Sequence, residues 1–208
     1  MGKRIAHELK EHIPFTALGA LTGIIIMAII AVFNVTHHIP EGVFHTLHPL
    51  HVLLSAIVTT AMYIRYSKGK IWAAVLIGWT GAIGIGTISD ALMPYLGGTL
   101  IGAEMEFHVP FIEKWWISLV ALAGVGISFL KQKTKIPHFG HVLLSTWASL
   151  FYLMTYGEAN WLPLLPFIFL ILFLAVWIPC CMSDIIYPLL FVRKGSEPSP
   201  PERPETVS

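Results

Sequence analysis

Six long apolar segments, separated by short polar stretches, run through this chain. They cover residues 15–34, 49–66, 71–92, 110–130, 138–156 and 161–192. Because about 20 apolar residues cross the hydrocarbon core of a bilayer, each segment is long enough to form a transmembrane helix. The last segment is interrupted by Pro163, Pro166 and Pro179. The pattern predicts an all-α integral membrane protein with six transmembrane helices.

The composition agrees with this prediction. Of 208 residues, 55% are hydrophobic and 12% are charged, and the mean hydropathy is +0.72. Soluble domains carry about 25% charged residues, so this chain falls outside their range. A net charge of +1 argues against a nucleic-acid partner. The two cysteines, Cys180 and Cys181, are adjacent within one apolar segment and indicate no disulfide framework.

The positions of the basic residues predict the topology. They gather in four places, at Lys3, Arg4 and Lys10, at Arg65, Lys68 and Lys70, at Lys131, Lys133 and Lys135, and at Arg193 and Lys194. The other three loops hold almost none, with Lys114 as the exception. By the positive-inside rule, both termini are predicted to be cytoplasmic in a multi-pass protein of the cell membrane. The proline-rich tail, 193–208, has no apolar run and is predicted to be disordered.

Three polar motifs occur twice in the same order. They are ExxxH followed by Ile or Val, Pro and Phe, then HxxHVLLS, then SDxxxP. The ligand-type residues of the two copies are Glu8 and His12 with Glu104 and His108, His48 and His51 with His138 and His141, and Asp90 with Asp184. The repeat predicts two three-helix units, 1–96 and 97–192. Because three spans is an odd number, the second unit enters the membrane from the opposite side, which predicts inverted repeats.

Inversion determines which motif copies can meet. It predicts an outer cluster of His48, His51, Asp90, Glu104 and His108, and an inner cluster of Glu8, His12, His138, His141 and Asp184. Residues three or four apart share one face of a helix, so each motif can offer two ligands together. Three imidazoles with two carboxylates suit a divalent ion of Fe, Mn, Zn, Co or Ni, with Zn, Fe and Mn as leading candidates. They are too rich in nitrogen for Ca²⁺ or Mg²⁺. We therefore expect two metal sites, one near each membrane face.

Other polar residues lie outside the repeated set. The first outer loop adds His37, His38, Glu41 and His45, which form either a polar loop rich in histidine or a trap that gathers cations. The cysteines near Asp184 and the serines of HVLLS are expected to serve packing. No charged residue lies between the two predicted clusters, so an ion crossing that region would need hydroxyl groups or a large rearrangement.

Three functions fit these features. The first is a transporter of divalent transition metal ions, in which protons released from histidine on metal binding would allow proton coupling. The second is a membrane protein with structural metal sites that acts as a sensor, chaperone or partner subunit. The third is a membrane-embedded metal-dependent hydrolase. Matched sites on both faces argue against an enzyme. The expected partners are membrane lipid and metal ions, and a homodimer is compatible with a bundle of this size.

Overall fold

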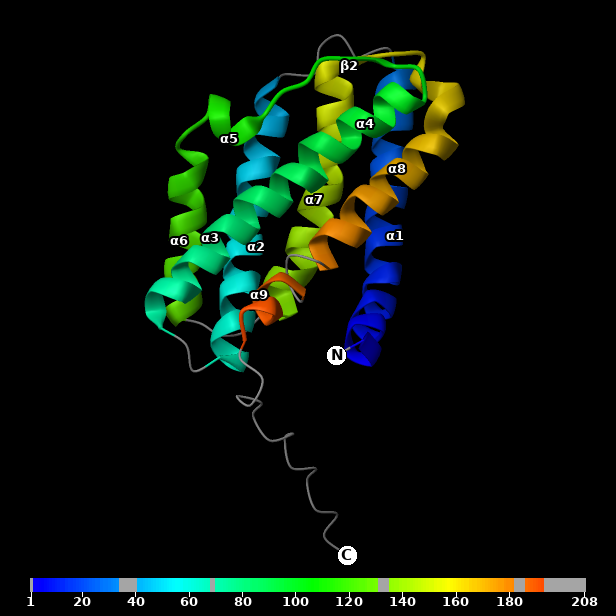
Figure 1. Ribbon diagram of the computed structural model, residues 1–208. Coiled ribbons are helices and arrows are strands. Elements are labelled where there is room, and N and C mark those ends of the chain that lie inside the picture. The colour runs from blue at the N-terminus through cyan, green and yellow to red at the C-terminus, as the bar shows by residue number, and fades with distance from the viewer. Residues whose placement is uncertain (1, 34–40, 68–69, 131–134, 182–185, 193–208) are drawn as a thin grey trace, which may run out of the picture.

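The computed structural model is a bundle of helices (Figure 1). It describes residues 2–33, 41–67, 70–130, 135–181 and 186–192. For residues 2–9, 11, 135–139 and 181 within these ranges, only the backbone is described. The statements that follow concern these parts of the chain.

Long helices make up most of the bundle. They are α1 (Gly2–Val32), α2 (Glu41–Tyr66), α3 (Ile71–Thr87), α6 (Ile117–Leu130), α7 (Lys135–Tyr156) and α8 (Trp161–Cys181). The shorter elements are the π-helical turn η2 (Ile88–Leu92), α4 (Met93–Leu100), α5 (Pro110–Glu113), α9 (Tyr187–Leu190) and the antiparallel pair β1 (Glu104–Met105) and β2 (Gly157–Glu158). The start of α1 lies at the same end of the bundle as α9, and α5 and β2 lie at the opposite end (Figure 1).

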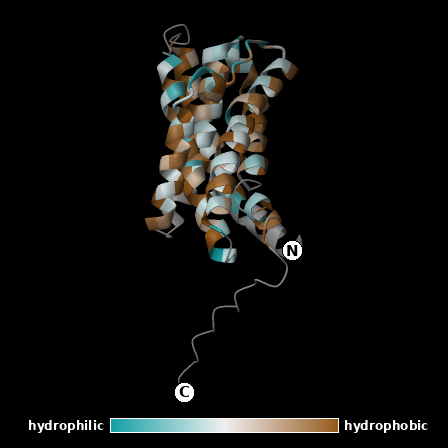
Figure 2. Ribbon diagram, turned by 60° about the vertical axis from the view of Figure 1, so that its left-hand side comes forward, coloured by the Kyte–Doolittle hydropathy of each residue, from teal (hydrophilic) through white to brown (hydrophobic). Residues whose placement is uncertain are grey.

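Four helical segments of the described chain are long and apolar enough to cross a membrane. They are His12–Val32, Glu41–Tyr66, Ile71–Leu100 and Trp161–Cys180. Large apolar side chains such as Leu18, Leu21 and Ile25 are exposed on the outside of α1. Figure 2 shows apolar residues along most of the length of the helices. Because water disfavours so large an exposed apolar surface, these helices indicate a membrane protein.

Helix α2 occupies the centre of the bundle. Two thirds of its apolar window is buried (67%), against 28% for the windows of α1 and α8, and it packs against α3, α6 and α7. The approach of α6 is close, since a Cβ atom on Gly124 would lie 2.5 Å from the carbonyl oxygen of Leu53. Helix α1 packs on α7 and α8, whereas α6 packs on α2 and α3. The first and second halves of the chain therefore interlock.

The π-helical turn η2 interrupts the rod formed by α3 and α4. Pro94 has no backbone N–H to continue the helix ladder, and the N–H of Met93 donates to the carbonyl of Ile88, five residues earlier. The hydroxyl of Ser149 donates to the carbonyl of Ser89 at 3.0 Å, which satisfies a backbone group of the wide turn. As a result Ser89, Asp90 and Ala91 are all buried, although three successive residues of a regular α-helix point in different directions.

The start of α2 differs from the expected span. The apolar pattern predicted a span beginning at residue 49, but the helix begins at Glu41 and Pro49 lies inside it. Glu41 in the first turn and Arg65 in the last turn both complement the helix dipole, which favours the longer helix. Consequently His48 and His51 lie two to three turns inside α2 rather than at its end.

Candidate metal centre

His48, His51 and Asp90 meet in the interior of the bundle. The two histidines lie three residues apart on α2, and both are almost completely buried. Asp90 reaches them from η2 and is fully buried. Burying a carboxylate is unfavourable unless it is hydrogen-bonded or paired, so its partners decide whether the arrangement is stable.

Asp90 has a full set of hydrogen-bond donors. Its Oδ2 atom accepts from Nδ1 of His48 at 2.8 Å and from Nδ1 of His51 at 2.6 Å. Its Oδ1 atom accepts from the hydroxyls of Ser89 and Ser145, each at 2.7 Å. Because an ionised carboxylate only accepts hydrogen bonds, both imidazoles carry a proton on Nδ1. When the rings are neutral, their lone pairs are therefore on Nε2.

This arrangement leaves the Nε2 atom of His48 with nothing to bind. The atom is buried and has no hydrogen-bond partner among the described residues. A buried polar atom without a partner costs about 1–3 kcal/mol. Histidines that bind metals commonly donate their other ring N–H to a carboxylate, which fixes the tautomer and the ring orientation. Asp90 thus holds the imidazoles in the form that binds a metal through Nε2.

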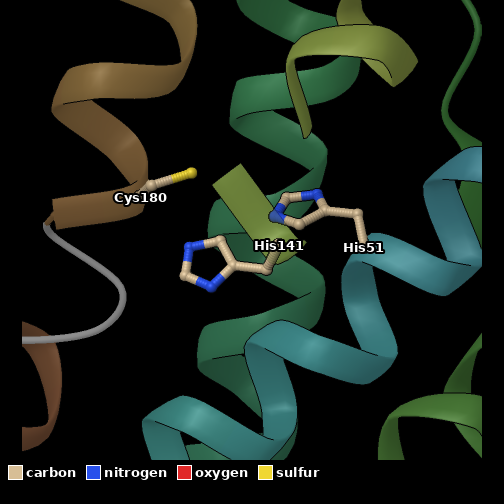
Figure 3. Close-up of side chains that lie close together, drawn as sticks. All are labelled: His51, His141 and Cys180. Carbon is tan, nitrogen blue, oxygen red and sulfur yellow. The ribbon is translucent and has the colours of Figure 1, made fainter. Parts of the chain in front are cut away.

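A second group of ligand-type atoms adjoins the first through His51. The rings of His51 and His141 have centroids 5.7 Å apart. One ligand atom from each of His51, His141 and Cys180 lies within 4.8 Å of the others. Figure 3 shows the thiol of Cys180 pointing toward the two rings, with the three side chains supplied by α2, α7 and α8. Ligands of tetrahedral zinc lie about 2.0–2.3 Å from the ion, so a small inward movement would let these three atoms share one.

We call His48, His51, Asp90, His141 and Cys180 the central cluster. It differs from the predicted outer cluster, of which only His48, His51 and Asp90 come together. Glu104 is exposed on β1, opposite Glu158. His108 binds Glu113, with its Nδ1 atom 2.9 Å from Oε1, and stacks on Tyr156. The chain beyond α4 turns at Gly102, where φ is 85°, and continues into β1 at the end of the bundle, away from η2.

The predicted inner cluster is described only in part. His12 is buried on α1 and His141 is buried on α7. The side chains of Glu8, His138 and Asp184 lie outside the described residues. The sequence assigned His51 and His141 to opposite membrane faces, and this separation is wrong because the two rings lie side by side. Both HxxH motifs lie inside their helices, so the second histidine of each comes close to the centre of the bundle.

Ser145 and Cys180 were predicted to be packing residues, and Ser89 was identified only as part of the repeated SDxxxP motif. Ser145 and Ser89 bind Asp90 directly, and Cys180 faces the two histidines. The spacing of the repeated motifs contained an indication that Cys180 lies near a histidine. Cys180 precedes Asp184 by four residues as Gly86 precedes Asp90, and a Cβ atom on Gly86 would lie 3.8 Å from Cε1 of His51. The equivalent position of the other half therefore also adjoins the second histidine of its HxxH motif.

The central cluster offers imidazole nitrogens, a thiol and a carboxylate in a buried setting. Such donors suit borderline or soft transition ions, because thiolate sulfur is a soft ligand. The side chains of His51, His141 and Cys180 could hold one metal ion, with Asp90 binding the ring of His51 rather than the ion. Comparison of the chain with family models, curated proteins and solved structures gives no match.

Proposed function

We propose that the protein transports a transition metal ion of the Zn, Fe or Mn class across the cell membrane through one central site. The observation that carries the proposal is the pair of histidines that share one oxygen of the buried Asp90 through Nδ1. Ionisable residues inside a membrane protein are costly and are usually retained for function. Here the carboxylate prepares two imidazoles for an ion that binds through Nε2.

The position of the site between the two halves favours transport. In transporters built from inverted repeats, the substrate binds near the midplane of the membrane at the repeat interface. In this chain His51 comes from the first half, while His141 and Cys180 come from the second. The packing of α1 on α7, matched by the packing of α6 on α2, is the exchange expected of two inverted units. These features support six spans arranged as inverted repeats, with the basic loops and both termini in the cytoplasm.

A structural metal site is the second candidate, and the burial of the cluster supports it. His48, His51 and Asp90 are each 2% exposed or less, and His141 is completely buried. A structural site is typically closed, with protein ligands occupying all positions of the ion. A metal in such a site would tie the two halves together in a sensor, chaperone or partner subunit. Binding and movement of the ion must therefore be measured separately.

The binding test compares the purified protein with variants of the central cluster. After equilibration with Zn²⁺, Fe²⁺ or Mn²⁺ and dialysis, bound metal is measured by inductively coupled plasma mass spectrometry. We expect His51→Gln, His141→Gln and Cys180→Ser each to lower occupancy of the same ion. Ser128→Ala is the control, since it changes a buried polar residue of α6 outside the central cluster. If the His51 and His141 variants each lost a different ion, two separate sites would replace the central site.

The transport test uses proteoliposomes that enclose a metal-sensitive dye. We expect the wild-type protein to raise the dye signal when metal is added outside, and His51→Gln to abolish this response. Empty liposomes and the Ser128→Ala variant serve as controls. Metal binding that depends on His51, combined with no flux in the wild-type protein, would reject transport and leave the structural role.

A further inference from the structure

A second group of ligand-type side chains lies at the end of the bundle that carries α5 and β2. Nε2 of His45 lies 2.8 Å from Oε1 of Glu41, one turn earlier on α2. One ligand atom from each of Glu41, His45 and Glu113 lies within 4.8 Å of the others. Glu113 comes from α5, so segments about 70 residues apart in the chain supply the group. We propose that these three residues, named the mouth cluster, bind a divalent transition metal ion that is about to enter the protein.

Neighbouring side chains hold the mouth cluster in place. The hydroxyl of Tyr156 lies 3.1 Å from both Oε1 of Glu41 and Nε2 of His45. Nδ1 of His108 lies 2.9 Å from Oε1 of Glu113, and the ring of His108 stacks on that of Tyr156 with centroids 4.1 Å apart. Hydrogen bonds of this kind orient the ligands of metal sites and raise their affinity. These hydrogen bonds and the ring stacking therefore fix the side chains of the mouth cluster, unlike those of isolated surface carboxylates.

The orientation of His45 directs one nitrogen toward the carboxylates. Its side chain is only 12% exposed, and its Nδ1 atom is buried with no hydrogen-bond partner among the described residues. The nitrogen that faces Glu41 is therefore Nε2. A metal ion between these side chains would replace the proton that now joins them. One imidazole and two carboxylates would leave further positions of the ion open to water, as in sites that exchange their ion.

The charge at this end of the bundle also favours a cation. Its described acidic residues are Glu41, Glu104, Glu106, Glu113 and Glu158. Lys114 is the one lysine or arginine among the described residues there. An unbalanced group of like charges raises the local concentration of the opposite ion and speeds its arrival. With Glu41 58% exposed, the mouth cluster is open to water, so we expect weaker binding there than in the buried central cluster.

Aromatic rings separate the mouth cluster from the central cluster. Phe44 is completely buried and stacks on His48, with centroids 5.5 Å apart. It also meets the rings of Tyr152 and Tyr156 edge-on, at 5.3 and 5.7 Å. His45 and His48 are three residues apart on α2, so an ion released from the mouth would meet the central histidines once these rings moved. Metal binding by the mouth cluster does not depend on the proposed transport function. The role of the cluster as a loading site does rest on that function.

The test measures metal binding with Zn²⁺ and with Mn²⁺ by equilibrium dialysis of the purified full-length protein. We expect two classes of site in the wild-type protein, one tight and one weaker. The double variant Glu41→Gln/Glu113→Gln should weaken the second class by about tenfold or more, as expected for loss of ligands or their supports. Tyr156→Phe, which keeps the ring and removes the hydroxyl, should weaken it less. The tight class should survive in both.

The matched control is the double variant Glu104→Gln/Glu158→Gln, which removes the same charge from the same end outside the cluster. If it weakened the second class as much as Glu41→Gln/Glu113→Gln, a diffuse surface charge would replace the proposed site. A second class that was unchanged in Glu41→Gln/Glu113→Gln would also overturn the proposal. Failure of the proposed central site would be recognised separately, because the tight class would then persist in the His51→Gln variant.

Discussion

Replacing Asp90 with asparagine tests the central cluster most directly. The carboxylate accepts four hydrogen bonds, two from imidazoles and two from hydroxyls. In Asp90→Asn, the amide oxygen can occupy the Oδ2 position and continue to accept from His48 and His51. The amide N–H₂ group then faces Ser89 and Ser145, whose hydroxyls can accept as well as donate. The variant should therefore fold while losing the negative charge behind both rings.

The expected loss concerns metal affinity more than stability. Removing the carboxylate behind a metal-binding histidine typically lowers metal affinity about 10–100-fold, or about 1.4–2.8 kcal/mol. Asp90→Ala is different, because it leaves the Nδ1–H groups of His48 and His51 buried without an acceptor. At about 1–3 kcal/mol for each group, we expect its free energy of unfolding to fall by about 2–6 kcal/mol.

Two measurements in detergent micelles separate these effects. Competition with a chromophoric chelator gives the metal affinity, and denaturant unfolding gives the stability. Ser145→Ala is the control, since it removes one hydrogen bond to Asp90 without touching either imidazole. We expect it to cost about 1 kcal/mol of stability and to leave metal affinity close to that of the wild type. Wild-type metal affinity in Asp90→Asn would refute the role given to the carboxylate.

Three further substitutions, one of them with a matched control, test the surroundings of the central cluster. Ser149→Ala removes the donor to the carbonyl exposed by the π-helical turn and should lower the free energy of unfolding by about 1 kcal/mol, measured by denaturant titration. Gly124→Ala places a Cβ atom 2.5 Å from a carbonyl oxygen of α2 and should destabilise by about 1–3 kcal/mol, whereas Gly126→Ala, with open space at the same helix, should be neutral or stabilising by up to about 1 kcal/mol. Phe44→Leu should speed the arrival of metal at His48 in stopped-flow experiments without changing equilibrium occupancy, and an unchanged rate would contradict the proposed aromatic barrier.

Helix formation was readable from local sequence because apolar length and charge placement are properties of short segments. The apolar pattern predicted the membrane character that the four long helices indicate. Its boundaries were less accurate. The polar first turns of α2 contain Glu41 and His45 and gave no apolar signal, yet helix dipole interactions and packing against Tyr156 extend the helix there.

The repeated motifs identified chemistry but not the full set of neighbours. The spacing of His48 and His51 places both on one helix face whatever the rest of the fold does, and the structure joins both to Asp90. Which further residues approach them depends on how deeply each motif lies within its helix and on which helices pack together. Those are non-local properties, so the pairing of His51 with His141 and Cys180 was decided by the contact of α2, α7 and α8.

The sequence by itself determined the apolar helices, the duplicated polar motifs and the histidine pairs, because each depends on residues close together in the chain. Only the tertiary structure decided that Glu104 and His108 lie away from Asp90, and that serine hydroxyls from η2 and α7 complete its hydrogen bonds. The π-helical turn that buries Asp90 also needed the fold, since the hydroxyl of Ser149 that satisfies its free carbonyl comes from a helix 60 residues further along the chain.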